Sequence, residues 1–161
     1  MERDRTGTKR RSGEVEAWCG SFRDRCRDRG VRVTPQRLAV YRALAEELSH
    51  PGAEALHARL RAGMPTLSLA TVYRILESFE REGLIRRVST PDAAGRFDAN
   101  VGAHQHLVCR ACGRVSDFTA PALTRLGMPA AIPPDFAPEE LDIRIVGLCR
   151  SCRGGGGSGV D

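Results

Sequence analysis

Apolar residues recur at helical spacing through the first half of the chain. The pair Thr34 and Pro35 is typical of a helix start, because a proline at the first helical position loses no backbone hydrogen bond. Two further helices are predicted, one from Gly52 and one that begins after Ser68 and ends at Gly83. The pattern therefore predicts three consecutive helices, and another helix is expected upstream of them.

The last of the three predicted helices is strongly amphipathic. Its apolar stripe consists of Leu69, Val72, Leu76 and Phe79, and the opposite side carries Ala70, Thr71, Arg74 and Arg81. Two extended runs, 84–89 and 96–99, then flank a turn-rich segment at 91–95 and predict a hairpin. Three helices followed by a hairpin are the element order of a winged helix.

The pattern changes to short strands in the second half, at 106–110, 114–118 and 141–148. We expect an α+β fold: a winged-helix domain and a small C-terminal α/β domain. The expected divisions are a flexible basic N-terminus at 1–14, the winged helix at 15–100, the second domain at 101–153, and a disordered Gly-rich tail at 154–161.

Composition narrows the class of partner. The 161 residues carry a net charge of +5, which favours a polyanion such as DNA. No apolar run approaches the roughly 20 residues that a membrane span needs, and the polar N-terminus does not resemble a secretory signal, so we expect a cytoplasmic protein. In a reducing compartment, closely spaced cysteines are metal ligands or redox centres more often than disulfides.

Two Cys-x-x-Cys pairs carry the strongest local chemistry. Four thiolates presented by two such pairs suit a tetrahedral structural zinc ion, although redox-active pairs are an alternative. The predicted zinc ligands are Cys109, Cys112, Cys149 and Cys152. The other two cysteines, Cys19 and Cys26, lie seven residues apart on one face of the upstream helix, where ordinary packing or exposure is expected rather than metal binding.

Further nitrogen and oxygen donors lie near the predicted domain boundary. His104 and His106 project from one face of a strand, so they can share a metal ion or simply form a polar strand face. His50, Asp98 and Asp117 are additional donors, each of which can equally be a capping, turn or surface residue. The sequence alone does not establish that the five converge.

The polar side of the amphipathic helix suits DNA recognition. Ala70 and Thr71 can contact thymine methyl groups, Arg74 can bind guanine or phosphate, and Tyr73 can contact the DNA backbone. Arg86 and Arg87 in the hairpin can hold phosphates, or they can be charges that protect an exposed sheet edge.

The ordered series of motifs from Cys19 to Cys152 resembles the ferric uptake regulator (Fur) family, and most of all its peroxide-responsive repressor branch. The segments that carry this resemblance are Val33-Thr34-Pro35-Gln36-Arg37, His50-Pro51, Ser68-Leu69-Ala70-Thr71-Val72-Tyr73-Arg74, Arg96-Phe97-Asp98, His104-Gln105-His106-Leu107-Val108-Cys109 and the last Cys-x-x-Cys pair.

The resemblance implies a homodimeric, metal-activated repressor that binds an inverted-repeat operator in double-stranded DNA. It implies that 101–153 is the zinc-binding dimerisation and metal-sensing domain. It also implies a regulatory Fe(II) or Mn(II) site formed by His50, Asp98, His104, His106 and Asp117, beside the structural zinc on the four cysteines. Aspartate at both 98 and 117 is similar to the peroxide-responsive branch, in which His50 and His104 would be the oxidised ligands.

Two alternatives remain open at this point. The first is a sensor of iron, manganese or nickel concentration without peroxide chemistry, and the second is a thiol redox enzyme that uses the cysteine pairs. The chain has no nucleophile elbow, phosphate loop or paired acid and base carboxylates, so we expect no enzyme activity. Ala103 and Gln105 replace donors that the family often has beside the two histidines, so a second exchangeable site is not expected.

Overall fold

The computed structural model describes residues 9–90, 95–127, 129, 131–139 and 141–154. The chain divides into two compact units, Met1–Val101 (unit 1) and Gly102–Asp161 (unit 2). Within the described parts of both units, none of the helices has the length and apolar character that a membrane crossing requires. The expected tail at 154–161 lies outside the described residues except for Gly154.

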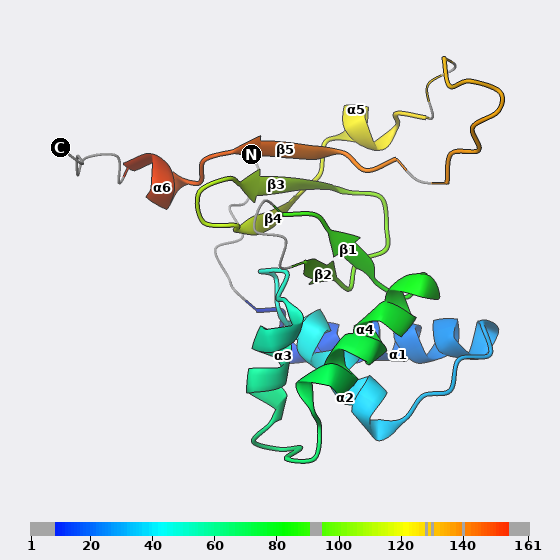
Figure 1. The fold of residues 1–161 in the computed structure, drawn as a ribbon, viewed down its shortest axis with the longest axis vertical. Helices are drawn as coiled ribbons and strands as arrows, with labels where there is room; N and C mark the ends of the chain where they lie inside the picture. The colour runs from blue at the N-terminus through cyan, green and yellow to red at the C-terminus, as the bar shows by residue number, and fades with distance from the viewer. Residues whose placement is uncertain (1–8, 91–94, 128, 130, 140, 155–161) are drawn as a thin grey trace. The chain divides into compact units, whose positions relative to one another are not determined.

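The described residues of unit 1 form four helices followed by a two-stranded hairpin (Figure 1). The helices are α1 (Ser12–Asp28), α2 (Pro35–Glu46), α3 (Ala53–Leu60) and α4 (Leu69–Arg81). The strands β1 (Arg86–Val88) and β2 (Arg96–Asp98) pair antiparallel. Helices α2 to α4 and the hairpin thus follow the order predicted for a winged helix, and the turn residues 91–94 lie outside the described part.

The predicted helix starts are capped as expected. Thr34 Oγ1 accepts the Arg37 N–H at 3.3 Å before α2, and Ser68 Oγ accepts the Thr71 N–H at 3.1 Å before α4. Gly83 follows α4 with φ at 62°, a left-handed conformation that a glycine adopts without steric cost. These local signals fix the bounds of the helix proposed to meet DNA.

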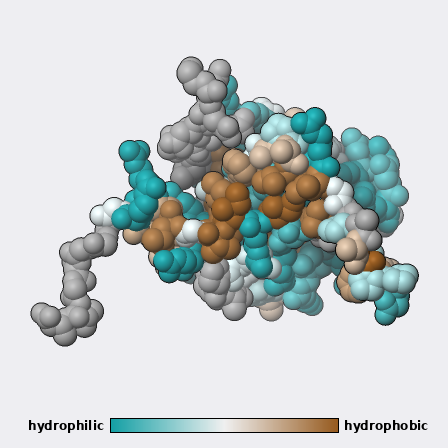
Figure 2. All heavy atoms as spheres, turned by 90° about the horizontal axis from the view of Figure 1, so that it is seen from above, coloured by the Kyte–Doolittle hydropathy of each residue, from teal (hydrophilic) through white to brown (hydrophobic). Residues whose placement is uncertain are grey.

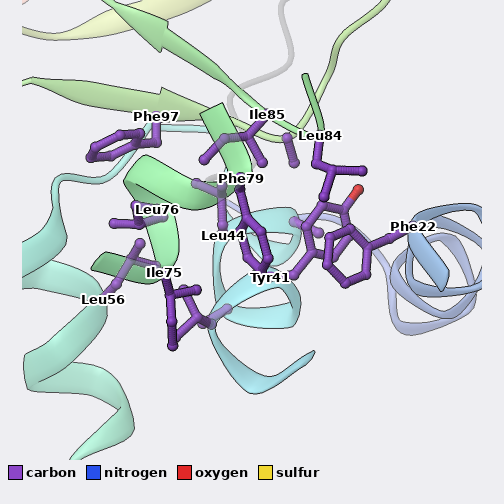
Figure 3. Packing of buried hydrophobic residues seen from close by; sticks show 14 of the residues in the cluster. Phe22, Tyr41, Leu44, Leu56, Ile75, Leu76, Phe79, Leu84, Ile85 and Phe97 are labelled. Atoms are coloured by element: carbon purple, nitrogen blue, oxygen red, sulfur yellow. The ribbon is translucent and has the colours of Figure 1, made fainter. Parts of the chain in front are cut away.

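An aromatic cluster forms the centre of unit 1 (Figure 3). Phe22 of α1 stacks on Tyr41 of α2 with ring centroids 3.9 Å apart, and Phe79 of α4 meets the edge of Phe22 at 5.0 Å. Cys19 and Cys26 are fully buried in the same core, which confirms the expected packing role. The three helices that carry these rings are therefore held as one body.

The N-terminal boundary differs from the expectation. Residues 9–14, assigned above to a flexible segment, include the start of α1 at Ser12. The Arg10 N–H donates to the Glu46 carbonyl at 2.8 Å, and its guanidinium lies 4.1 Å from the centroid of the Trp18 ring. These contacts anchor Arg10 and the start of α1, whereas residues 1–8 lie outside the described part.

Unit 2 contains a three-stranded mixed sheet of order β4-β3-β5. Its elements are β3 (Gln105–Cys109), β4 (Val115–Phe118), α5 (Pro121–Thr124), β5 (Arg144–Gly147) and α6 (Arg150–Gly154). β3 pairs antiparallel with β4 and parallel with β5. The strand formed within the run predicted at 141–148 is the shorter β5, which pairs with His106 to Cys109 of β3.

One face of unit 2 is unusually apolar. In Figure 2, which views the molecule from the β5 side, hydrophobic side chains form a band. Ile145 of β5 is 46% exposed, and Leu107, its register partner in β3, and Leu148 are exposed to a similar extent. A sheet edge with exposed apolar side chains is a surface that proteins normally cover with a partner or a loop.

Candidate metal centres and nucleic-acid surface

The four predicted zinc ligands converge within unit 2. Cys109 ends β3, Cys112 lies in the following turn, Cys149 follows β5, and Cys152 lies in α6. One sulfur from each residue lies within 4.8 Å of the others, and the Cys112 and Cys149 sulfurs are 3.8 Å apart. Tetrahedral coordination with Zn–S bonds of about 2.3 Å separates two sulfurs by about 3.8 Å, so the geometry fits zinc.

Backbone groups prepare one of these thiols for metal binding. The N–H of Cys149 donates to the Cys109 sulfur at 3.3 Å. This bond, with further backbone N–H groups from Cys112 and Ala111, lowers the pKa of Cys109 to about 6. Cys152 shares hydrogen bonds with the other thiols, chiefly Cys149, and its pKa is raised to about 12. Such a cluster exchanges its shared protons for a metal ion.

A second donor group in unit 2 joins β3 to β4. The Nε2 atoms of His104 and His106 lie 3.0 Å apart, and Asp117 Oδ1 lies 3.5 Å from the first and 3.9 Å from the second. The β3–β4 register places His106 directly opposite Asp117. Both imidazole side chains are almost fully buried. The group can present two nitrogens and one oxygen to a cation.

A backbone carbonyl fixes the orientation of the His104 ring on the side away from His106. Its Nδ1 lies 2.8 Å from the carbonyl oxygen of Gly102, an acceptor, so Nδ1 carries the proton. Nε2, the atom nearest His106, then carries the lone pair through which an imidazole binds a metal ion. A backbone carbonyl that sets the tautomer in this way is typical of metal-binding histidines.

The third group of possible metal donors is a pair of residues in unit 1. His50, between α2 and α3, and Asp98, at the end of β2, are both 3% exposed, and their Nε2 and Oδ2 atoms are 3.6 Å apart. The N–H of Phe97 donates to the Pro51 carbonyl and joins the two segments. His50 has φ at 52°, a conformation that non-glycine residues adopt chiefly at constrained or functional positions.

The expected DNA-contacting residues lie on one side of α4. Val72, Ile75, Leu76 and Phe79 face the core, whereas Ala70 and Arg74 are exposed and Thr71 and Tyr73 are half-buried. The Arg74 guanidinium donates to Thr71 Oγ1 at 3.2 Å. The Tyr73 hydroxyl donates to Glu54 of α3, and this bond raises the pKa of Tyr73. Sequence analysis did not identify Glu54 as a partner.

The two wing arginines lie in different surroundings. Arg87 donates to Glu80 of α4 at 3.1 Å and lies over the Phe97 ring, so its charge is used within unit 1. Arg86 is half-buried on the neighbouring face of the hairpin, opposite Asp98 in the strand register. A DNA contact by Arg86 remains a prediction.

Sequence reasoning also missed a polar residue between the two strand histidines. Gln105 is 3% exposed, and its carboxamide bonds to Ala120 and Thr124 at the start and end of α5. The signal was the strand alternation, since a residue between His104 and His106 must point to the opposite face.

The fold and these donor groups define a class: metal-binding regulators that carry a winged helix. Residues 28–145 match the ferric uptake regulator family, and this match covers most of the chain. The chain belongs to the ferric uptake regulator family.

Individual relatives agree with this assignment. The chain is 35% identical over 127 residues to the peroxide-responsive repressor PerR of Staphylococcus aureus (strain USA300), covering 79% of this chain and 86% of the relative. The Vibrio cholerae ferric uptake regulator structure is similar, with a TM-score of 0.61, 28% identity and coverage of 78% and 98%. The Pseudomonas aeruginosa ferric uptake regulator with manganese also has a TM-score of 0.61, with 26% identity and coverage of 80% and 98%.

Proposed function

We propose that the protein is a dimeric, metal-dependent transcriptional repressor that releases its operator when hydrogen peroxide oxidises histidine ligands of the regulatory metal. The observation that carries the proposal is the pair of imidazole nitrogens 3.0 Å apart beside the Asp117 carboxylate. The 35% identity to a peroxide-responsive repressor supports the choice of signal. The four-cysteine cluster would hold zinc as a structural ion.

The regulatory ion would use donors from both units: His50 and Asp98 together with His104, His106 and Asp117. Three nitrogens and two oxygens suit Fe(II) or Mn(II) better than a thiolate set would. An ion held by both units favours one arrangement of the two over the others by its differential affinity. We infer that this arrangement is the one that binds the operator.

The peroxide response would reside in the ligand set. A bound Fe(II) would supply the electron that activates hydrogen peroxide. In the overall reaction one peroxide oxygen would be inserted into a C–H bond of a ligand imidazole, and the other would leave as water. His50 and His104 are the residues proposed to accept the inserted oxygen. An oxidised imidazole is a poorer nitrogen donor, so the site loses affinity for its ion. Mn(II), which does not support this chemistry readily, would leave the ligands intact.

The DNA surface would be the polar side of α4, with Ala70, Thr71, Tyr73 and Arg74, and Arg86 in the wing. Arg74 and Thr71 already contact each other, which limits the orientations that each side chain samples. Contacts from arginine to phosphate release counterions, so binding should weaken steeply as salt is raised. A two-fold symmetric dimer would bind an inverted repeat.

A second copy of this chain is the proposed partner for the apolar face of unit 2. β5 is an edge strand in the order β4-β3-β5, and all four of its residues are exposed. A pocket of about 280 Å³ beside it is lined by Leu107, Ile145 and Leu148 among others. Homodimer interfaces are more apolar than ordinary protein surface, as this face is.

Peptide mass spectrometry after peroxide treatment tests the proposal. The zinc-bound protein is loaded anaerobically with Fe(II), treated with limiting hydrogen peroxide and digested. We expect one added oxygen on the peptides that carry His50 or His104, together with loss of operator binding. His57 is the internal control, because it bonds to the Leu67 carbonyl and belongs to no donor group described above.

Mn(II) in place of Fe(II) is the matched metal control and should abolish the modification. Unmodified histidines despite confirmed iron occupancy would contradict peroxide sensing. Operator binding that follows metal supply but survives peroxide would instead identify a sensor of metal concentration. Equal oxidation of His57 would show non-specific damage and would also contradict the proposal.

A further inference from the structure

The inference concerns Gln105, the residue between the two strand histidines. Its side chain is buried in unit 2, with only 3% of the residue exposed. A buried carboxamide without partners is costly, and here both of its ends are used. Oε1 accepts the Ala120 N–H at 3.0 Å, and Nε2 donates to Thr124 Oγ1 at 3.2 Å.

The bonds form a closed ring with the backbone. The Thr124 hydroxyl accepts from Gln105 and donates to the Ala120 carbonyl at 3.0 Å. Ala120 is the N-cap residue of α5 and has no polar side chain with which to cap the helix. Gln105 accepts its N–H from a distant strand, as the glutamate of a capping box does from within a helix.

The position of this ring relates it to the donor group. Successive strand side chains point to opposite faces, so Gln105 is held on one face of β3 while His104 and His106 project from the other. Anchoring one face restricts rotation of the strand about its axis. Such a rotation would move both imidazoles together and disturb their 3.0 Å approach.

The ring also fixes the strand that carries the third donor. β4 ends at Phe118, and Ala120 follows after a single residue. Holding the Ala120 N–H therefore restrains the exit of β4 close to Asp117. One side chain thus ties together the two strand ends from which His104, His106 and Asp117 project.

We propose that Gln105 is a positioning residue of the regulatory metal site: it locks β3 to the β4–α5 connection and so sets the geometry of His104, His106 and Asp117 without touching the ion. The inference rests on the proposed function of that donor group. Residues that orient metal ligands typically change metal affinity by roughly 10-fold to 100-fold when they are removed.

The test measures the Kd of Mn(II) for the zinc-bound, full-length protein and for Gln105→Met, which keeps the volume and removes both hydrogen bonds. We expect a loss of affinity of at least roughly tenfold. Thr124→Val removes the hydroxyl and should cause a smaller loss, whereas Thr124→Ser retains it and should restore wild-type affinity. Zinc content, measured in parallel, should remain unchanged in every variant.

The outcomes separate this inference from the proposed function. If the wild-type protein binds no Mn(II), or binds it equally well after His104→Ala, the proposed regulatory site is wrong. If the wild type binds through His104 and Gln105→Met has the same Kd, the positioning role is overturned. If Gln105→Met loses its zinc and does not fold, the Thr124→Val and Thr124→Ser pair decides, and equal Kd values for those two would overturn the inference.

Discussion

Unit 1 and unit 2 are stabilised in different ways. Unit 1 has a continuous core in which Phe22, Tyr41 and Phe79 contact one another across three helices. Among the described residues of unit 2, the buried hydrophobic ones are Val108, Cys109 and Val115, and seven large apolar side chains are exposed. Small domains with little core generally need a metal ion or a partner.

The difference agrees with the division of labour in the proposed function. A helix that meets DNA must keep its shape, and α4 is held by its own buried stripe. Unit 2 has elements joined by cysteines far apart in the chain, and it presents an apolar face. The folded structure of unit 2 would depend on zinc and on a second copy of the chain. The unit proposed to sense the signal would thus be the one whose stability depends on bound partners.

Removal of zinc is expected to have the largest effect. Structural zinc contributes on the order of 10 kcal/mol or more to the folding of small domains. Cys112→Ser, or strong chelation, should therefore unfold unit 2 while unit 1 stays folded. Hydrogen exchange resolved by peptide measures both, and Cys19→Ala is the control that should retain zinc. If the amides of unit 2 stayed protected from hydrogen exchange without zinc, the two units would not differ in their need for a metal ion.

A core truncation in unit 1 should have the opposite effect: it should destabilise unit 1 and leave the zinc site of unit 2 intact. Phe79→Ala removes a fully buried ring that contacts Phe22 and Tyr41, and it should cost about 3–5 kcal/mol of unfolding free energy. The measurement is denaturant unfolding followed by the fluorescence of Trp18 in α1. Bound zinc should remain. Loss of zinc at the same denaturant concentration would show that the two units fold as one.

A charge on β5 tests what covers the apolar face. Ile145→Lys should weaken the proposed dimer by about a hundredfold, equivalent to about 2.7 kcal/mol, because a lysine would be buried at its interface. Light scattering across a concentration series measures the dissociation constant. Leu126→Lys is the matched control, since Leu126 is similarly exposed but lies outside the sheet. A dimer disrupted only by the control variant would place the interface elsewhere.

The winged-helix elements were predictable because their signals are local. Thr34 and Ser68 cap the helices that follow them, and the spacing of Val72, Leu76 and Phe79 decides which side of α4 is buried. The zinc ligands were equally predictable from the sequence, because the Cys-x-x-Cys spacing limits each pair to a single turn. The structure confirms that these cysteines converge.

The remaining features depend on contacts that no local pattern specifies. Gln105 contacts α5 across the sheet, and Glu54 accepts the Tyr73 hydroxyl from a different helix. Arg10, within the segment expected to be flexible, bonds to Glu46, which lies far away in the sequence. Polar partners of this kind are set by tertiary packing, which a single sequence does not encode in its periodicity.

Alkaline pH should weaken unit 1 by the smallest amount considered. Burial is the main cause that raises the pKa of Tyr41 to about 12 from an ordinary value of 10.0. The folded protein keeps the phenol proton more tightly than the unfolded chain does. The contribution of Tyr41 to the free energy of unfolding is therefore complete below pH 10. It is lost progressively as pH rises towards 12, by about 2 kcal/mol.

Denaturant unfolding of unit 1 between pH 9 and 12 measures this loss, with Tyr41→Phe as the control that lacks the ionisable group. The variant should give up the hydrogen bond from Arg25, yet its stability should vary less with pH. The same alkaline slope in both proteins would assign the loss to other groups. Since Tyr41 lies at the centre of the aromatic cluster, a slope specific to it would show that the folded core of unit 1 is what holds the phenol proton.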